Sequence, residues 1–134
     1  MKNNPTTILY VDDDEDDREF LSEAFKEVAP EVEVVLAENG LKALDYLSAV
    51  KDNHTKLPSL IVLDINMPYL DGVQTFQRIK QEPELQRVPV VIFTSSENPS
   101  DKTLFSGFGV ELITKPDNIS YLNQIANRML SNYS

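Results

Sequence analysis

Residues 60–64 have the sequence Leu60-Ile61-Val62-Leu63-Asp64, in which four apolar residues end abruptly at a carboxylate. A short, continuous apolar run of this kind predicts a β-strand that is buried on both faces. Strands buried on both faces are typical of parallel sheets covered by helices. The change to Asp64 therefore predicts a charged group at the point where a central strand leaves the core.

Strand-like runs also occur on both sides of this segment, and each is separated from the next by a helix-like pattern. Between the runs, apolar residues recur at spacings of three and four, which predicts amphipathic helices. The predicted strands span residues 8–11, 32–37, 60–63, 88–93 and 111–114. The apolar positions of the predicted helices lie within residues 20–28, 41–50, 73–79, 100–108 and 119–130.

The alternation of strands and helices predicts the fold class. Four of the five predicted strands are apolar on both faces, so we expect an α/β fold with a doubly wound parallel sheet and helices on both faces. The 134 residues, 41% of them hydrophobic, suit a single domain over residues 1–134 with a core of about residues 6–132. Ligands of such sheets bind beyond the carboxyl ends of the strands.

Composition excludes several functional classes. The chain has 22 acidic and 12 basic residues and a formal charge of -10, so nucleic acids and anionic membrane surfaces are not expected partners. It contains no cysteine, which excludes disulfides and thiolate metal sites. No apolar run approaches the roughly 20 residues of a membrane span, and the start lacks a signal-peptide pattern. A soluble, cytoplasmic protein is therefore expected.

Polar groups follow four of the five predicted strands: Asp12 and Asp13, Asp64, Thr94, and Lys115. Taken alone, a residue such as Thr94 would be interpreted as a solvated loop residue or a helix cap. Together, however, the carboxylates would repel by about 3 kcal/mol per pair, and a hard cation such as Mg²⁺ would relieve that repulsion. A lysine and a hydroxyl can then meet phosphoryl oxygens, so the set predicts phosphoryl transfer to a carboxylate.

The ordered motifs of the chain resemble the four signatures of response-regulator receiver domains over about residues 6–132. This resemblance implies the flavodoxin-like strand order 2-1-3-4-5. Residues 37–44 and 83–90 are further similar to small stand-alone regulators of bacterial phytochrome-type kinases. The four signatures are Ile8-Leu9-Tyr10-Val11-Asp12-Asp13-Asp14, Leu63-Asp64-Ile65-Asn66-Met67-Pro68 with Asp71-Gly72, Phe93-Thr94-Ser95, and Thr114-Lys115-Pro116.

The resemblance implies a phosphoacceptor in two-component signal transduction, with Asp64 as the phospho-acceptor. It further implies that Asp13 binds Mg²⁺ directly, that Asp12 acts through the metal or its water, and that the backbone carbonyl of Asn66 is another ligand. Thr94 would hydrogen-bond the phosphoryl group and Lys115 would pair with it.

Two local features follow from the same resemblance. The bond between Lys115 and Pro116 is expected to be a cis peptide, which proline tolerates. Three residues before the lysine, where better-known members carry an aromatic switch residue, this chain has Leu112. We therefore expect Leu112 to be buried in the last strand and the conformational signal to be modest.

The donor and the target are expected to be proteins. The only histidine, His54, lies in a polar segment and is expected to be an exposed loop residue, so the chain has no evident phosphohistidine of its own. No Gly-rich phosphate loop is present, which argues against ATP as the direct donor. A sensor histidine kinase or a histidine phosphotransfer protein is the expected donor, with a downstream protein as the target. The sequence leaves open a homodimer through the surface of the fourth helix, last strand and last helix.

Three alternatives were weighed against this interpretation. Asp12, Asp14, Asp16 and Glu23 match the acidic spacing of a calcium-binding EF-hand loop, but the sixth position lacks the required glycine. A phosphatase with Asp64 as covalent nucleophile usually has a second acid two residues later, where this chain has Asn66. A pure interaction module would not need all of the site residues. The chain is therefore not expected to be an enzyme beyond assisting its own phosphorylation and dephosphorylation.

Overall fold

The computed structural model describes residues 6–53 and 56–133, in which strands and helices alternate along the chain. Helix starts are encoded locally: Asp14, Asn39, Asp71 and Asn98 each accept a hydrogen bond at the start of the helix that follows. The elements are β1 (Thr7–Val11), α1 (Glu15–Val28), β2 (Glu33–Ala37), α2 (Gly40–Val50), β3 (Leu60–Leu63), α3 (Gly72–Gln81), β4 (Val90–Thr94), α4 (Pro99–Gly107), β5 (Leu112–Thr114), the 3₁₀ turn η1 (Ile119–Tyr121) and α5 (Leu122–Tyr133).

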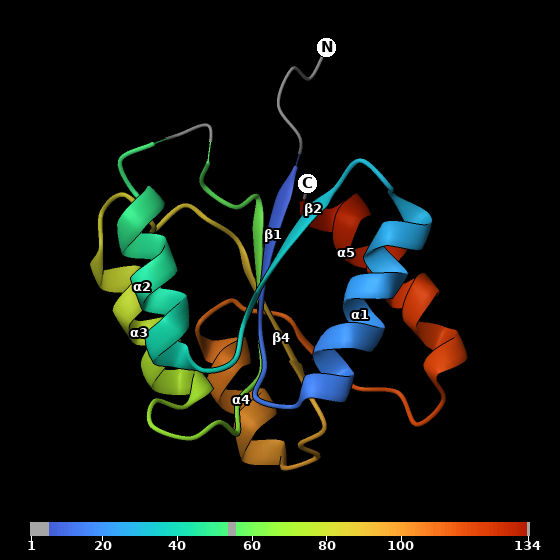
Figure 1. The fold of residues 1–134 in the computed structure, drawn as a ribbon. Coiled ribbons are helices and arrows are strands. Elements are labelled where there is room, and N and C mark those ends of the chain that lie inside the picture. The colour runs from blue at the N-terminus through green and yellow to red at the C-terminus, as the bar shows by residue number, and fades with distance from the viewer. Residues whose placement is uncertain (1–5, 54–55, 134) are drawn as a thin grey trace.

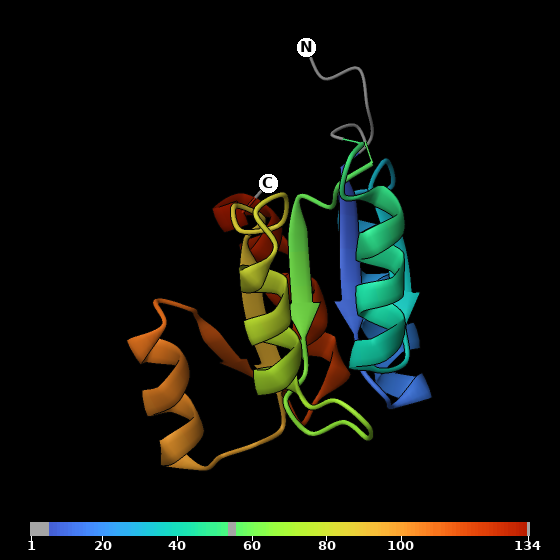
Figure 2. The same cartoon turned by 90° about the vertical axis from the view of Figure 1, so that its left-hand side faces the viewer.

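All five strands are parallel and lie in the order β2-β1-β3-β4-β5, which confirms the predicted flavodoxin-like fold. In Figure 1, α2 and α3 lie on one side of the sheet and α1 and α5 on the other. Figure 2 shows α4 beside the β5 edge of the sheet, and Phe105 of α4 contacts Phe76 of α3. None of the helices among the described residues is both long and apolar enough to cross a membrane.

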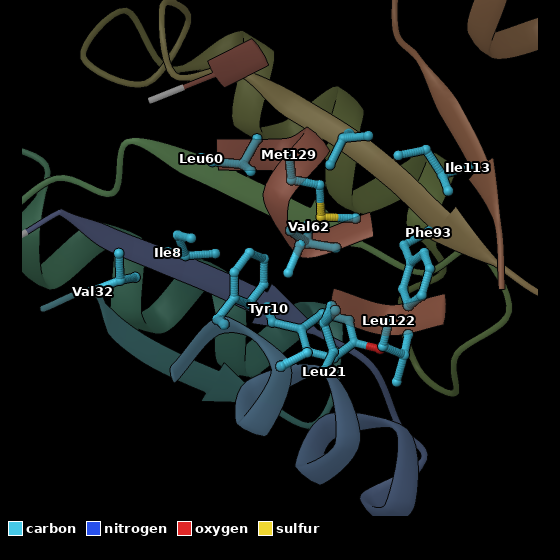
Figure 3. Close-up of a cluster of buried hydrophobic side chains, with 14 of the residues drawn as sticks. Ile8, Tyr10, Leu21, Val32, Leu60, Val62, Phe93, Ile113, Leu122 and Met129 are labelled. Carbon is cyan, nitrogen blue, oxygen red and sulfur yellow. The ribbon is translucent and has the colours of Figure 1, made fainter. Parts of the chain in front are cut away.

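Two hydrophobic clusters form the core, one on each face of the sheet. On the α1 and α5 face, Ile8 and Tyr10 of β1 pack with Phe25 and Met129, and Figure 3 shows part of this cluster. On the opposite face, side chains of α2, α3 and α4 cover the alternate residues of the same strands. Successive side chains of a strand point to opposite faces, so each central strand contributes to both clusters.

The outer strands differ from the prediction that four strands would be apolar on both faces. Only β1, β3 and β4 are buried along their whole length, whereas β2 and β5 are partly exposed because they form the two edges of the sheet. The prediction for the last helix also began too early. Ile119 lies in η1 and is 57% exposed, and α5 begins at Leu122.

Candidate functional site

The predicted site residues meet at the carboxyl end of the sheet, which is the lower edge in Figure 1. Val11 of β1 lies in register with Leu63 of β3, so the residues that follow them, Asp12 and Asp64, emerge side by side. Carboxylate oxygens of Asp12, Asp13 and Asp64 all lie within 4.8 Å of one another. This is the cluster of carboxylates that the sequence predicted, and its oxygens suit a hard divalent cation.

Lys115 is the cation at the centre of this cluster. Its Nζ lies 2.7 Å from Asp12 Oδ2, 2.8 Å from Asp17 Oδ2 and 3.2 Å from Asp64 Oδ2. Burial by itself would lower the pKa of Lys115, but hydrogen bonds to Asp12 and Asp17 outweigh that effect and raise it. The lysine is therefore firmly charged at neutral pH and holds three carboxylates together.

Asp12 is fully buried, and both oxygens of its carboxylate have hydrogen-bond donors. The hydroxyl of Tyr10 donates to Oδ2 at 2.6 Å, and the backbone N–H of Asp14 donates to Oδ1 at 2.9 Å. The guanidinium of Arg18 donates to the backbone carbonyl of Asp12 at 2.6 Å. These contacts, together with Lys115, compensate the cost of burying a carboxylate.

Asp64 is less well compensated. Burial raises the pKa of its carboxyl, and the neighbouring charge of Asp12 raises it further. Lys115, a hydrogen bond with Thr94 and the N–H of Ile65, 2.7 Å from Oδ1, act in the opposite direction but leave the pKa above its ordinary value. Asp64 is 6% exposed, so the carboxyl that the sequence predicts as the phospho-acceptor is buried in surroundings that disfavour its charged form.

Thr94 connects the site to the loop before α4. It is the last residue of β4 and is fully buried, and its hydroxyl accepts a hydrogen bond from the N–H of Ser96 at 3.2 Å. The backbone N–H of Lys115 donates to the carbonyl of Thr94 at 2.7 Å. The ends of β4 and β5 therefore deliver the hydroxyl and the ammonium to the same place.

Five predicted residues thus lie together: Asp12, Asp13, Asp64, Thr94 and Lys115. Asn66 is exposed in the loop after β3, and the metal-binding role of its carbonyl stays a prediction. The predicted cis bond before Pro116 was wrong, because the described residues contain no cis peptide. A trans bond is lower in energy even before proline, and the Lys115 side chain meets all three carboxylates with it.

Sequence reasoning missed two contributors to the site. Asp17 lies in the first turn of α1 and was not among the predicted site residues, yet it pairs with Lys115. Nothing in the local sequence distinguishes Asp17 from the other acids of that turn. Tyr10 was interpreted as a core residue only, although it lies two residues before Asp12 and so on the same face of the strand.

Other sequence expectations have mixed outcomes. The acids of the EF-hand pattern are dispersed: Asp12 is buried, whereas Asp14 caps α1 and is exposed. Leu112 is only half-buried, so the expectation of a buried residue was wrong, because β5 is an edge strand. His54 lies outside the described residues.

The sequence model of the response regulator receiver domain matches residues 8–127, which include every residue of the cluster. The chain belongs to this family. Response regulator Rcp1 of Synechocystis sp. is 36% identical over 100 residues, which cover 74% of this chain and 68% of Rcp1. Response regulator Rre1 of the same organism is 33% identical over 95% of this chain, but the matched region spans only 52% of Rre1.

Solved structures agree with this assignment. The phosphorylated cyanobacterial phytochrome response regulator RcpA superimposes with a TM-score of 0.84 at 32% identity, covering 96% of this chain and 94% of RcpA. The Mn²⁺-bound form of Rcp1 superimposes with a TM-score of 0.81 at 32% identity, covering 95% and 93%. The chain is therefore a receiver domain with a phosphoacceptor role in two-component signalling, and its acidic cluster is consistent with divalent metal binding.

Proposed function

We propose that Asp64 accepts a phosphoryl group from a phosphohistidine of a sensor histidine kinase or phosphotransfer protein, in a reaction that requires Mg²⁺. One observation carries this proposal: the carboxylates of Asp12, Asp13 and Asp64 converge within 4.8 Å beside the ammonium of Lys115. A nucleophilic carboxylate, a cation site and a fixed positive charge are the parts that phosphoryl transfer needs.

The residues fit Mg²⁺, although the relatives point only to a divalent metal. All three candidate side chains offer hard oxygen ligands. Asp13 is exposed, so a hydrated ion can reach its carboxylate from solvent. Asp12, Asp13 and Asp64 would hold the ion, with the backbone carbonyl of Asn66 as a further ligand. The bound cation would supply charge neutralisation at the phosphoryl oxygens.

The chain's own residues account for the remaining requirements of the transfer. An oxygen of Asp64 forms a bond to phosphorus while the phosphorus–nitrogen bond of the donor breaks, and the donor imidazole leaves and takes up a proton. Thr94 and Lys115 then meet the oxygens of the new acyl phosphate, Thr94 as a hydroxyl donor and Lys115 as a cation. Lys115 starts within 3.2 Å of Asp64, so a side-chain rotation rather than a backbone movement brings it to the phosphoryl group.

The acceptor can be tested with a small-molecule phosphodonor. Incubation with acetyl phosphate and Mg²⁺, followed by intact mass spectrometry, should add the mass of one phosphoryl group to the wild type and none to Asp64→Asn. Asp117→Asn is a suitable control because Asp117 is an exposed acid just beyond Lys115. Phosphorylation of the Asp64→Asn variant at the wild-type level would show that another residue is the acceptor.

The metal can be tested without any phosphodonor. Mg²⁺ should raise the unfolding temperature of the wild type, because it binds the assembled cluster and not the unfolded chain. Asp13→Asn should lose most of this increment while folding normally, since Asp13 is exposed. A full Mg²⁺ increment in that variant would place the ion away from Asp13.

A surface beside the site suits the protein donor. Phe20 of α1 and Ile119 of η1 are exposed apolar residues, 37% and 57% accessible, and they line one small cavity together with Lys115. We expect Ile119→Ser to slow transfer from a phosphorylated kinase and to leave acetyl phosphate labelling unchanged. Leu41→Ser, an exposed leucine of α2 that is 46% accessible, serves as the control. Equal rates of transfer to the two variants would show that the donor binds at another surface.

The same proposal treats the chain as a regulator and not as a turnover enzyme. The phosphatase alternative predicts repeated hydrolysis of acetyl phosphate. The inorganic phosphate released would then quickly exceed one equivalent per protein chain. The regulator predicts one phosphoryl group per chain and slow decay. Measuring phosphate release together with intact mass in one time course distinguishes the two.

The face formed by α4, β5 and α5 is proposed as the surface that reads out phosphorylation, including through a homodimer. On this face, Lys102 and Ser106 of α4 line one hollow together with Glu111 and the half-buried Leu112 at β5. Light scattering with and without acetyl phosphate should detect a dimer, and Lys102→Glu should weaken it. A monomer in both conditions would assign this face to the downstream protein target.

A further inference from the structure

We infer that Tyr10 is a positioning residue of the phosphorylation site, which holds one oxygen of Asp12 so that the other faces the metal site. This inference rests on the proposed function, because it concerns how the same site is organised. Tyr10 does not touch the reacting atoms; it acts through Asp12. The evidence lies in the burial of Tyr10, the partners of Asp12 and the engagement of Lys115.

The phenol of Tyr10 is buried where packing alone has no use for a hydroxyl. Tyr10 is fully buried in the cluster on the α1 and α5 face, and its ring centroid lies 6.2 Å from that of Phe93. Figure 3 shows Tyr10 surrounded by apolar side chains. A buried hydroxyl needs a partner, and the partner here is Oδ2 of Asp12 at 2.6 Å. A phenylalanine would fill the same space, so the hydroxyl serves the carboxylate.

The two oxygens of Asp12 have different partners. Oδ2 accepts from the Tyr10 hydroxyl at 2.6 Å and lies 2.7 Å from the Lys115 ammonium. Oδ1 accepts only the N–H of Asp14, at 2.9 Å, among the contacts of the described residues. A carboxylate oxygen has about two acceptor positions, so Oδ2 is filled and Oδ1 keeps one. Oδ1 is therefore the oxygen available to a metal ion or its water.

The Tyr10 hydroxyl becomes more important when the site is phosphorylated. Lys115 must then turn towards the phosphoryl oxygens, which removes the cation from Oδ2 of Asp12. Asp12 is fully buried, so bulk water cannot replace the lost partner. Tyr10 is then the group that keeps Oδ2 satisfied and prevents Asp12 from following Lys115.

Tyr10→Phe isolates the hydroxyl because it keeps the buried ring. Tyr133→Phe is the matched control: the Tyr133 hydroxyl also donates to a carboxylate, Glu111 at 2.7 Å, but from the end of α5. Both variants lose one hydrogen bond to a carboxylate, and only one of them loses it at the site. A purely structural role for Tyr10 predicts that the two variants differ from the wild type in stability alone.

The experiment is a Mg²⁺ titration of the wild type, Tyr10→Phe and Tyr133→Phe without phosphodonor. Binding is measured by isothermal titration calorimetry and by the rise in unfolding temperature. We expect Tyr10→Phe to need about fivefold more Mg²⁺ for half-saturation, the loss expected for one net hydrogen bond, and Tyr133→Phe to match the wild type. At subsaturating Mg²⁺, acetyl phosphate should also label a smaller fraction of Tyr10→Phe. Wild-type Mg²⁺ affinity and labelling in a folded Tyr10→Phe variant would overturn the inference.

A second measurement keeps the test valid if Tyr10→Phe folds poorly. In wild-type protein labelled with 3-fluorotyrosine, the ¹⁹F resonance of Tyr10 should shift with Mg²⁺ at the same half-saturation as the calorimetric signal, while that of Tyr133 should not. An unmoved Tyr10 resonance would contradict the inference. If the wild type binds Mg²⁺ but acetyl phosphate never labels it, the proposed function fails, whereas the titration still decides the role of Tyr10 in metal binding.

Discussion

Replacing Lys115 by methionine should reveal how strongly the acidic cluster depends on one cation when the metal has been removed with a chelator. Methionine keeps the length and apolar character of the side chain but removes the ammonium. In the metal-free protein, Asp12 and Asp64 would then face each other without the charge that now lies 2.7 Å and 3.2 Å from them. We expect the variant to fold, because the apolar core is unchanged, but to be markedly less stable.

The size of the loss follows from burial. At an effective dielectric of 20, each contact near 3 Å is worth about 5 kcal/mol before the cost of desolvation. The side chains of Asp12 and Asp64 are 0% and 8% exposed, and removing one partner of such a buried pair costs about 3–5 kcal/mol. The contact with Asp17 adds little because that side chain is 36% exposed. Because Tyr10 still donates a hydrogen bond to Asp12, we expect the free energy of unfolding to fall by about 3 kcal/mol.

Urea unfolding with a chelator at pH 7 measures this loss. Lys42→Met is the control, because Lys42 and Glu38 form a pair at 2.9 Å in which both side chains are more than half exposed, and it should cost less than about 1 kcal/mol. The raised pKa of Lys115 means that its contribution is complete below its ordinary pKa and is lost only at still higher pH, so the loss should be the same at pH 7 and pH 9. Equal stabilities of the two variants would refute the reasoning.

Four further outcomes are expected from the same structure. The pKa of Asp64 is raised in the fold, so its carboxyl stabilises the folded state below its ordinary pKa and loses that contribution as pH rises through the raised value. Asp64→Asn should therefore raise metal-free stability at pH 7. Relative to that variant, the stability of the wild type should fall between pH 4 and pH 7. Tyr69 is the one described non-glycine residue with positive φ, at 69°, so Tyr69→Asn should stabilise the chain by about 1 kcal/mol in urea unfolding, whereas Tyr121→Asn should not. In Gly72→Ala, the new Cβ would lie 2.3 Å from the carbonyl oxygen of Asp64, which should cost about 1–3 kcal/mol and slow acetyl phosphate labelling, with Gly107→Ala as an uncrowded control. Leu112→Ala should cost about 1–2 kcal/mol, less than a fully buried leucine, and leave the labelling rate unchanged; a large loss of labelling would show that Leu112 supports the site directly.

The central strands and the site could be predicted from the sequence because one physical rule governs both. Apolar runs buried on two faces must lie in the middle of a parallel sheet, and their carboxyl ends meet at one edge. Asp12, Asp64 and Thr94 each directly follow or end such a run, so their proximity follows from the pattern alone. The edge strands β2 and β5 were less predictable, since a run can be apolar and still lie at the margin of the sheet.

The missed residues act across elements, and local patterns do not reveal such contacts. Asp17 is one of several acids at the start of α1, and nothing in its neighbourhood indicates which of them faces Lys115, 98 positions later in the chain. Tyr10 satisfies the apolar pattern of β1 so well that its hydroxyl carries no separate signal. Both residues are found only when the end of β5 is placed against β1 and α1.

The geometry also explains why phosphorylation of this chain should depend on a metal ion for more than the chemistry at phosphorus. Lys115 is engaged by Asp12, Asp17 and Asp64 before any phosphoryl group arrives. If Lys115 left these partners in the absence of another cation, the buried carboxylates of Asp12 and Asp64 would repel each other directly. In the proposed site, Asp12, Asp13 and Asp64 would hold a divalent ion, whose charge would neutralise them once Lys115 leaves. Metal binding should therefore precede the movement of Lys115, and that order follows from the charges at the strand ends.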